Sequence, residues 1–209
     1  HLFTAAMFFS VYMRQVLLMP FLIALLALVP MAYFMLTRPF PEKARTAEPA
    51  WVVLGGAYVV LPVLMLFHIH LFFPEGRTWV FFILLVIFSS DTGAFYVGKA
   101  LGKHKLYEAL SPNKTWEGAV GGLLSSLLVA ALFLRIFPVR EVGIPILLLV
   151  VFLSAAGQIG DLVESMLKRN RGIKDSGKAL PGHGGLLDRV DGLLFGIPIF
   201  YAYLSVYGI

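Results

Sequence analysis

The chain has 209 residues, of which 59% are hydrophobic and 14% are charged, and its formal net charge is +5. This composition excludes a soluble globular domain, because the surface of a soluble fold needs more polar groups than this chain supplies. The absence of cysteine excludes disulfides, thiolate nucleophiles and zinc–thiolate sites. The basic residues lie between apolar segments, so we expect membrane lipids and phosphorylated substrates as partners and no nucleic acid.

Long apolar segments dominate the chain, and each is close to the length of about 20 residues that crosses a bilayer as a helix. They are predicted at 16–36, 51–73, 78–98, 116–137, 142–167 and 192–208. We therefore expect an all-α integral membrane protein of about six transmembrane helices, with a polar cavity at its cytoplasmic face. The start at His1, within an apolar stretch, indicates a fragment of a longer protein. The predicted domains are amino-terminal spans over 1–88 and a catalytic transmembrane domain over 89–209.

Lysine and arginine divide unevenly between the alternate connections of these spans. Of the 17 basic residues, thirteen lie on one side and four on the other. The positive-inside rule places the thirteen in the cytoplasm. The sequence thus predicts an inner-membrane or plasma-membrane protein whose active site faces the cytoplasm. Trp79 lies at the start of a span, where indole rings favour the membrane interface, so we expect it there.

Acidic residues gather at the cytoplasmic ends of the spans. These are Asp91, Glu117, Asp161, Glu164, Asp175, Asp188 and Asp191. One ionised carboxylate inside a membrane costs about 2.5–3.5 kcal/mol, so several together require compensation, which a cation and a polyphosphate substrate would provide. One face of a helix is predicted to carry Asp161, Glu164, Ser165 and Lys168. An open alternative is a buried Glu164–Lys168 ion pair, with Asp161 bonded to a neighbouring helix.

A glycine-rich polar segment follows, with the sequence NRGIKDSGKALPGHGGLLDRVD. Its glycines let the backbone approach a ligand closely, and Lys174, Lys178 and His183 suit phosphate oxygens. Asp188 and Asp191 are three residues apart, so at the start of a helix both carboxylates would face one way. Paired oxygen ligands of this kind suit Mg²⁺. The alternative is a basic loop followed by a helix that Asp188 caps.

Two further polar motifs lie upstream on the same side. SSDTGAFYVGKALGKHKL carries Asp91, and SPNKTWEGAVGG opens the next span. The hydroxyl and amide side chains of the second motif suit either helix caps or, together with Lys114, a grip on a nucleotide. Its paired glycines, Gly121 and Gly122, are expected to allow close helix packing.

The 27 residues from Ser165 to Asp191 resemble the signature of the CDP-diacylglycerol synthases, or phosphatidate cytidylyltransferases. The matching pieces are SMLKR, KDSG, LPGHGG and LLDRVD at the family's spacing, and the two upstream motifs also look like this family. The resemblance covers the chain from about Ser89 onward. It implies that CTP and phosphatidate react to give CDP-diacylglycerol and pyrophosphate. It also implies Mg²⁺, with K⁺ as a further candidate near the same carboxylates, and a homodimer is an open alternative.

The resemblance also implies roles for individual residues. Metal binding maps to Asp161, Asp188 and Asp191, and the catalytic set adds Lys174 and His183. Substrate binding is expected from Ser111, Asn113, Lys114, Thr115, Lys168, Arg169, Lys174 and Arg189. Support behind these groups is expected from Asp91, Glu164 and Ser165.

Three other functions compete with this one. An ion-coupled transporter also buries acids, but its acids lie near the midplane between repeated halves, and no repeat is visible here. A CDP-alcohol phosphotransferase would require a longer run of spaced aspartates. A cytidylyltransferase acting on another lipid, such as an ether-linked one, stays open on the sequence.

Overall fold

The computed structural model describes residues 2–13, 23, 47–108, 110–170, 172–173, 176–177, 185 and 187–207, without the side chains of 2–3, 47–52 and 170. The chain divides into two compact units, His1–Phe72 and Phe73–Ile209. The predicted functional division between residues 88 and 89 is a different one and stays a prediction.

The first unit consists of two helices, α1 (Leu2–Tyr12) and α3 (Ala47–Phe72). They pack through a small apolar core that includes Met7, Val11 and Leu64. Within α3, Val53–Phe72 is long and apolar enough to cross a membrane, which confirms the span predicted at 51–73. The span predicted at 16–36 lies outside the described residues, apart from Ile23.

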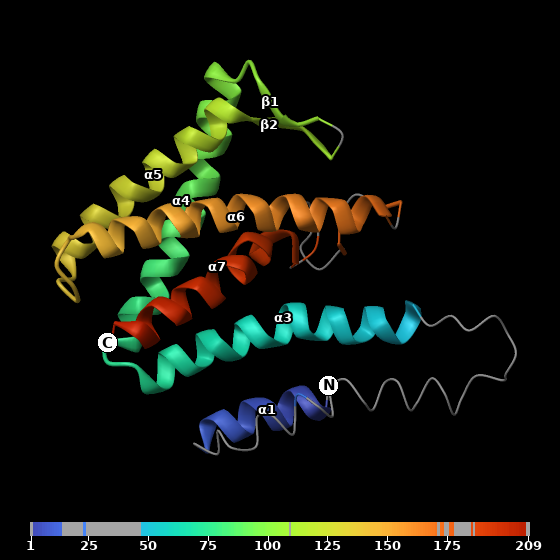
Figure 1. Cartoon of the computed structure of the whole chain (residues 1–209), viewed down its shortest axis with the longest axis vertical. Coiled ribbons are helices and arrows are strands. Elements are labelled where there is room, and N and C mark those ends of the chain that lie inside the picture. Colours follow the sequence, from blue (N-terminus) through green and yellow to red (C-terminus); the bar gives the residue numbers. More distant parts are fainter. Residues whose placement is uncertain are drawn as a thin grey trace, which may run out of the picture. The chain divides into compact units, whose positions relative to one another are not determined.

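The second unit contains four long helices: α4 (Gly76–Leu101), α5 (Trp116–Ile136), α6 (Ile144–Asn170) and α7 (Leu187–Val206). Helix α4 contacts the other three, and α6 and α7 run side by side (Figure 1). Each of the four contains a segment that can cross a membrane. The last four predicted spans are therefore confirmed, and α4, α6 and α7 extend a few residues beyond the predicted segments into polar sequence.

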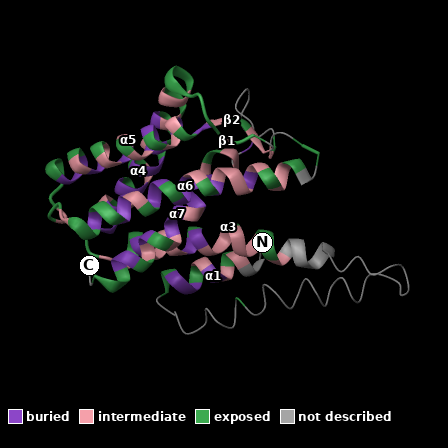
Figure 2. Ribbon diagram, turned by 45° about the horizontal axis from the view of Figure 1, so that its top comes forward, coloured by how far each residue is buried: buried purple, intermediate pink, exposed green. Residues whose placement is uncertain are grey.

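Exposure in this unit is the reverse of that in a soluble protein. Buried residues lie on the facing sides of the helices, as Figure 2 shows. The outer faces carry large apolar side chains, such as Phe81, Leu124 and Phe152, which are 63%, 61% and 59% exposed. Such faces are stable against hydrocarbon and unstable against water. The chain is an integral membrane protein.

The core of the second unit is rich in aromatic rings. Trp79 has no exposed surface, and its ring lies 5.7 Å from that of Phe82 and 5.9 Å from that of Phe200. Edge-to-face contacts at these distances stabilise aromatic clusters. The expectation that the Trp79 indole faces the membrane interface is therefore wrong, because contacts with α7 bury it.

A short β-hairpin, absent from the all-α prediction, connects α4 to α5. Strands β1 (Lys105–Tyr107) and β2 (Ser111–Thr115) pair antiparallel, with Lys105 opposite Thr115. Thr115 is the N-cap of α5 and accepts a hydrogen bond of 3.1 Å from the amide of Gly118, which confirms one of the expected caps. Strands this short and polar have no alternating pattern that a sequence could reveal.

Glycines bring two helix pairs into close contact. Between α4 and α5, a Cβ on Gly122 would lie 2.6 Å from the carbonyl oxygen of Ser90, which confirms the close packing expected there. Between α6 and α7, a Cβ on Gly160 would lie 2.7 Å from the carbonyl oxygen of Asp191, and one on Gly192 would lie 3.1 Å from that of Gly157. This second contact sets the distance between the acidic residues of the two helices.

Candidate active site

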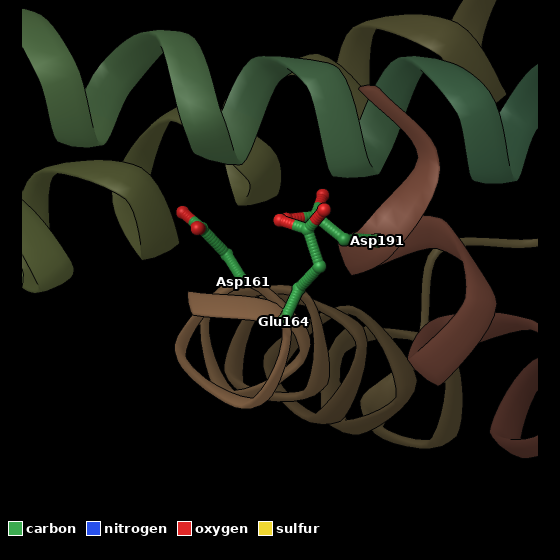
Figure 3. Close-up of side chains that lie close together, drawn as sticks. All are labelled: Asp161, Glu164 and Asp191. Atoms are coloured by element: carbon green, nitrogen blue, oxygen red, sulfur yellow. The ribbon is translucent and has the colours of Figure 1, made fainter. Parts of the chain in front are cut away.

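Three carboxylates converge where α6 and α7 touch. Asp161 and Glu164 project from α6 and Asp191 from α7, and one oxygen of each lies within 4.8 Å of the others (Figure 3). Glu164 and Asp191 are only 1% and 8% exposed. Like charges so close together in a medium of low dielectric constant repel strongly, so this group needs positive charge beside it.

Lys168 supplies part of that charge. Its Nζ lies 2.7 Å from Glu164 Oε2 and 2.6 Å from Asp188 Oδ1, so the alternative ion pair predicted within α6 is present. The contact with Glu164 is close enough for an ion pair, although its angles are not those of a hydrogen bond. Among the described residues, no hydrogen-bond donor reaches Glu164 Oε1. A buried carboxylate oxygen without a donor is costly, and it is available to a cation.

Lys114 supplies further positive charge, from strand β2. Its Nζ lies 2.6 Å from Asp161 Oδ2 and donates a hydrogen bond of 3.4 Å to the carbonyl oxygen of Gln158. The Gln158 side chain in turn donates to the carbonyl oxygen of Ala119 at 3.1 Å. Sequence reasoning missed Gln158, although an amide three residues before Asp161 in an apolar helix was a detectable signal.

A cavity of about 540 Å³ lies between α4, the hairpin, α5 and α6, a volume typical of small-molecule sites. The predicted residues on its wall are Asp91, Ser111, Asn113, Lys114, Thr115 and Asp161. Two lysines that sequence reasoning did not select, Lys99 and Lys105, also line it. The structure therefore brings both upstream motifs and the first acid of α6 together around one space.

Asp188 lies outside the group of three carboxylates, and its own carboxylate is surrounded by hydrogen-bond donors. Its Oδ1 accepts from Lys168, and its Oδ2 accepts from the amide and hydroxyl of Ser176, both at 2.9 Å, and from the amide of Gly185 at 2.7 Å. The group of three carboxylates contains Glu164 and not Asp188. A metal-binding role for Asp188 stays a prediction, and its carboxylate is already engaged by four donors.

The remaining predicted residues lie around the ends of α6 and α7. Arg169 is exposed, and its guanidinium donates to the carbonyl oxygen of Ile173 at 3.5 Å. Gly172, with φ of 67°, ends α6 in a conformation that glycine adopts without strain. Ser165 is half-buried on α6, and Arg189 is exposed on the first turn of α7. The described residues do not include Lys174, Asp175, Lys178 and His183.

Glu117 holds the hairpin in place. Its carboxylate accepts from the backbone amides of Lys103 and His104 at 3.1 and 3.2 Å, and it lies 2.6 Å from His104 Nδ1. Hydrogen bonds to a charged acceptor are shorter and stronger than those to a neutral one. Glu117→Ala is therefore expected to speed hydrogen exchange at the Lys103 and His104 amides about tenfold or more. Unchanged exchange would contradict this role, and Glu141→Ala, at an exposed loop glutamate, is the matched control.

The chain is similar in sequence to a known family and to curated bacterial proteins. The cytidylyltransferase family matches residues 1–207 of the chain. The chain belongs to the cytidylyltransferase family. The phosphatidate cytidylyltransferase of Bacillus subtilis is 43% identical over 160 residues, which are 77% of this chain and 60% of that protein. The phosphatidate cytidylyltransferase of Staphylococcus saprophyticus is 42% identical over 176 residues, 83% of this chain and 66% of that protein.

Membership in the cytidylyltransferase family confirms the resemblance seen from Ser89 onward and extends it to the amino-terminal helices. It favours this family over the transporter and the CDP-alcohol phosphotransferase. The chain spans 60% and 66% of the length of these two relatives, so the activity of the whole protein is a matter for proposal.

Proposed function

We propose that this chain carries the active site of a phosphatidate cytidylyltransferase, which converts CTP and phosphatidate to CDP-diacylglycerol and pyrophosphate. The observation that carries the proposal is the set of three carboxylates beside a lysine-lined cavity at the ends of membrane-spanning helices. The names of the relatives supply the substrate pair. The lipid acceptor accounts for the membrane setting, and the nucleotide accounts for the polar cavity.

The described residues fit a divalent cation. Asp161, Glu164, Asp188 and Asp191 are linked by close contacts to Lys114 and Lys168. Four carboxylates and two ammonium groups leave a formal charge of −2 on this connected group, and Asp91 on the adjoining cavity wall adds to it, so the group favours a cation. Asp161, Glu164 and Asp191 would hold the ion, with the unpartnered oxygen of Glu164 among the ligands. When bound, Mg²⁺ would neutralise the charge on substrate phosphate oxygens. K⁺ beside it stays a prediction.

The reaction requires no covalent intermediate with the protein, whose side chains would position the substrates and neutralise their charge. An oxygen of the phosphatidate phosphate attacks the α-phosphorus of CTP, a new phosphoanhydride bond forms, and the bond to the β-phosphate breaks as pyrophosphate leaves. The attacking phosphate is already ionised near neutral pH, so no general base is needed. Lys99, Lys105 and Lys114 would neutralise the triphosphate in the cavity, and the polar side chains of β2 would orient it.

The membrane setting fits two substrates of opposite solubility. The apolar outer faces of the helices allow the acyl chains to stay in hydrocarbon while the lipid phosphate reaches the ends of α6 and α7. The excess of basic residues supports a cytoplasmic orientation of this end in an inner or plasma membrane. A homodimer stays a prediction.

Purified full-length protein with CTP labelled in the α-phosphate, phosphatidate and Mg²⁺ provides the direct test. The expected result is a labelled lipid and one pyrophosphate per lipid formed. Diacylglycerol in place of phosphatidate is the control, and it should give no labelled lipid because it lacks the attacking phosphate. Absence of labelled lipid with every phosphorylated lipid acceptor would contradict the proposal.

Lys114→Met is expected to raise the KM for CTP about tenfold or more, because it removes an ammonium group from the cavity wall. The measurement is initial rate against CTP concentration at saturating phosphatidate. Lys103→Met is the matched control, since Lys103 lies near the hairpin but outside the cavity wall. Equal KM values for the two variants would remove Lys114 from nucleotide binding.

A further inference from the structure

We infer that Gln158 selects the base of the nucleotide: its amide oxygen accepts a hydrogen bond from the exocyclic amino group of cytosine and rejects uracil. The inference deepens the proposed function and rests on it for the presence of CTP in the cavity. Gln158 lies on α6, three residues before Asp161, and it lines the cavity. The contacts of its side-chain amide determine which polar atom a ligand meets there.

Hydrogen bonds of the Gln158 amide nitrogen fix the orientation of the amide group. Nε2 donates to the carbonyl oxygen of Ala119, on α5, at 3.1 Å, and to Ser154 Oγ at 3.4 Å. A backbone carbonyl can only accept, so the nitrogen and not the oxygen of the amide must lie against Ala119. Rotation of the amide by half a turn would bring two carbonyl oxygens together.

Ser154 is itself held by a neighbouring helix. Its Oγ lies 2.8 Å from Ser90 Oγ, on α4, and Ser154 and Ser90 are 1% and 0% exposed. Water does not compete for a hydrogen bond between two buried hydroxyls, so this pair keeps its geometry. These contacts join α4 to α6 and α6 to α5, and they hold the Gln158 amide in one orientation.

The amide oxygen of Gln158 is left for a ligand. Within the part of the chain that the structure describes, both hydrogen bonds of this side chain are made by Nε2, and no donor reaches Oε1. Oε1 is not a buried atom either, and the residue lines the cavity, so a molecule in the cavity can reach it. The site therefore presents an acceptor of fixed direction, which requires an N–H or O–H donor.

Small residues leave space beside this acceptor for a flat ring. Ala94 and Gly98 of α4 and Gly118 of α5 line the same cavity as Gln158, and Phe95 adds an aromatic ring to its wall. The three lysines that would neutralise the triphosphate also line this cavity. A base beside Gln158 and a triphosphate beside the lysines would thus share one space of about 540 Å³.

Cytosine and uracil differ in the group that would meet Gln158 Oε1. Cytosine carries an amino group, which donates, where uracil carries a carbonyl oxygen, which accepts. Uracil would place two acceptors together, and the amide cannot turn to relieve the repulsion because Ala119 holds its nitrogen. A ribose hydroxyl can donate to Oε1 as well. However, a hydroxyl also accepts, so it does not require an amide of fixed orientation.

Equilibrium binding of nucleotides tests this inference in the absence of phosphatidate. Full-length protein in detergent with Mg²⁺ binds labelled CTP, and the competitors are UTP, dCTP and the triphosphate of pyrimidin-2-one riboside. The pyrimidinone carries a hydrogen atom in place of the amino group. We expect it to bind about tenfold or more weakly than CTP, and UTP about 100-fold or more weakly, with dCTP within about threefold of CTP.

Gln158→Met assigns this discrimination to one residue, because methionine has a similar length and lacks the amide oxygen. The variant should lower the ratio of CTP affinity to UTP affinity about tenfold or more, mainly through weaker binding of CTP. Ser126→Ala is the matched control. It removes a buried hydroxyl that donates to Leu123 within α5, outside the cavity wall, and it should leave the ratio unchanged.

Each outcome bears on a different part of the inference. Failure of CTP to bind would overturn it together with the proposed function. Binding of CTP with equal binding of the pyrimidinone, or an unchanged ratio in Gln158→Met, would overturn the inference alone. A loss of discrimination against dCTP in Gln158→Met, in place of UTP, would assign Oε1 to the ribose and overturn it also. If Gln158→Met does not insert, Ser154→Ala releases one contact of the amide and should lower the ratio about twofold or more; an unchanged ratio there would then overturn the inference.

Discussion

Replacing Asp191 with asparagine is expected to abolish CTP-dependent pyrophosphate release to within the detection of an ordinary assay, a loss of about 100- to 1000-fold or more. Asparagine keeps the size of the side chain and removes one of three charges that face a common point. Asp191 is only 8% exposed, so water can compensate little for the lost charge. Initial rates in purified, membrane-inserted protein provide the measurement.

A second substitution shows whether the group of three acts as a unit. Glu164→Gln should reduce the rate to a similar extent, because the unpartnered oxygen of Glu164 belongs to the same group. The control is Glu141→Gln, which changes an exposed loop glutamate and should leave the rate unchanged. Near-normal activity in Asp191→Asn would refute the cation site. Near-normal activity in Glu164→Gln alone would remove Glu164 from it.

Gly160→Ala is expected to reduce activity about tenfold to 100-fold, although it adds one methyl group and changes no charge. The added Cβ would lie 2.7 Å from the carbonyl oxygen of Asp191 and 3.1 Å from the Cα of Gly192, so α6 and α7 must separate. That separation would move Asp161 and Glu164 away from Asp191. Overpacking of this kind also lowers the free energy of unfolding by about 1–3 kcal/mol.

Gly143→Ala is the matched control for this substitution. Among the residues that the structure describes, a Cβ there meets the Cδ of Pro145 alone, at an ordinary contact distance of 3.7 Å. Both variants are compared by thermal inactivation in detergent and by kcat at a temperature where both stay folded. Equal kcat values for the two variants would show that the close contact between α6 and α7 does not set the geometry of the site.

The sequence predicts the helices of this fold well, because an apolar segment of bilayer length has few other structures open to it. The sequence does not predict features that depend on packing between helices, such as the direction in which a side chain points. Trp79 has the same place in the sequence whether its ring faces headgroups or Phe200, and only the contact with α7 distinguishes the two. The β1–β2 hairpin has too few residues for a periodic pattern.

Spacing in the sequence indicates which residue types gather at the candidate site, but it does not indicate which partners each side chain contacts. The i, i+3 spacing of Asp188 and Asp191 predicts that both face one way, and spacing alone cannot show that Ser176 and Gly185 engage Asp188. Glu164 was expected behind the site, and the structure places it among the three converging carboxylates. Hydrogen bonds that join distant parts of the chain leave no periodic trace in the sequence.

The contact between Lys114 and Asp161 has a consequence for how a nucleotide enters. Before any substrate arrives, the ammonium group already has an internal anion, which acts as a competitor for the triphosphate. In the proposed reaction, entry of CTP would therefore exchange one counterion of Lys114 for another, since this ammonium group is already paired with Asp161. Such an exchange lowers affinity for anions that bring no cation of their own, since Asp161 would be left without a partner. The site would in this way select the metal–nucleotide complex over the free nucleotide.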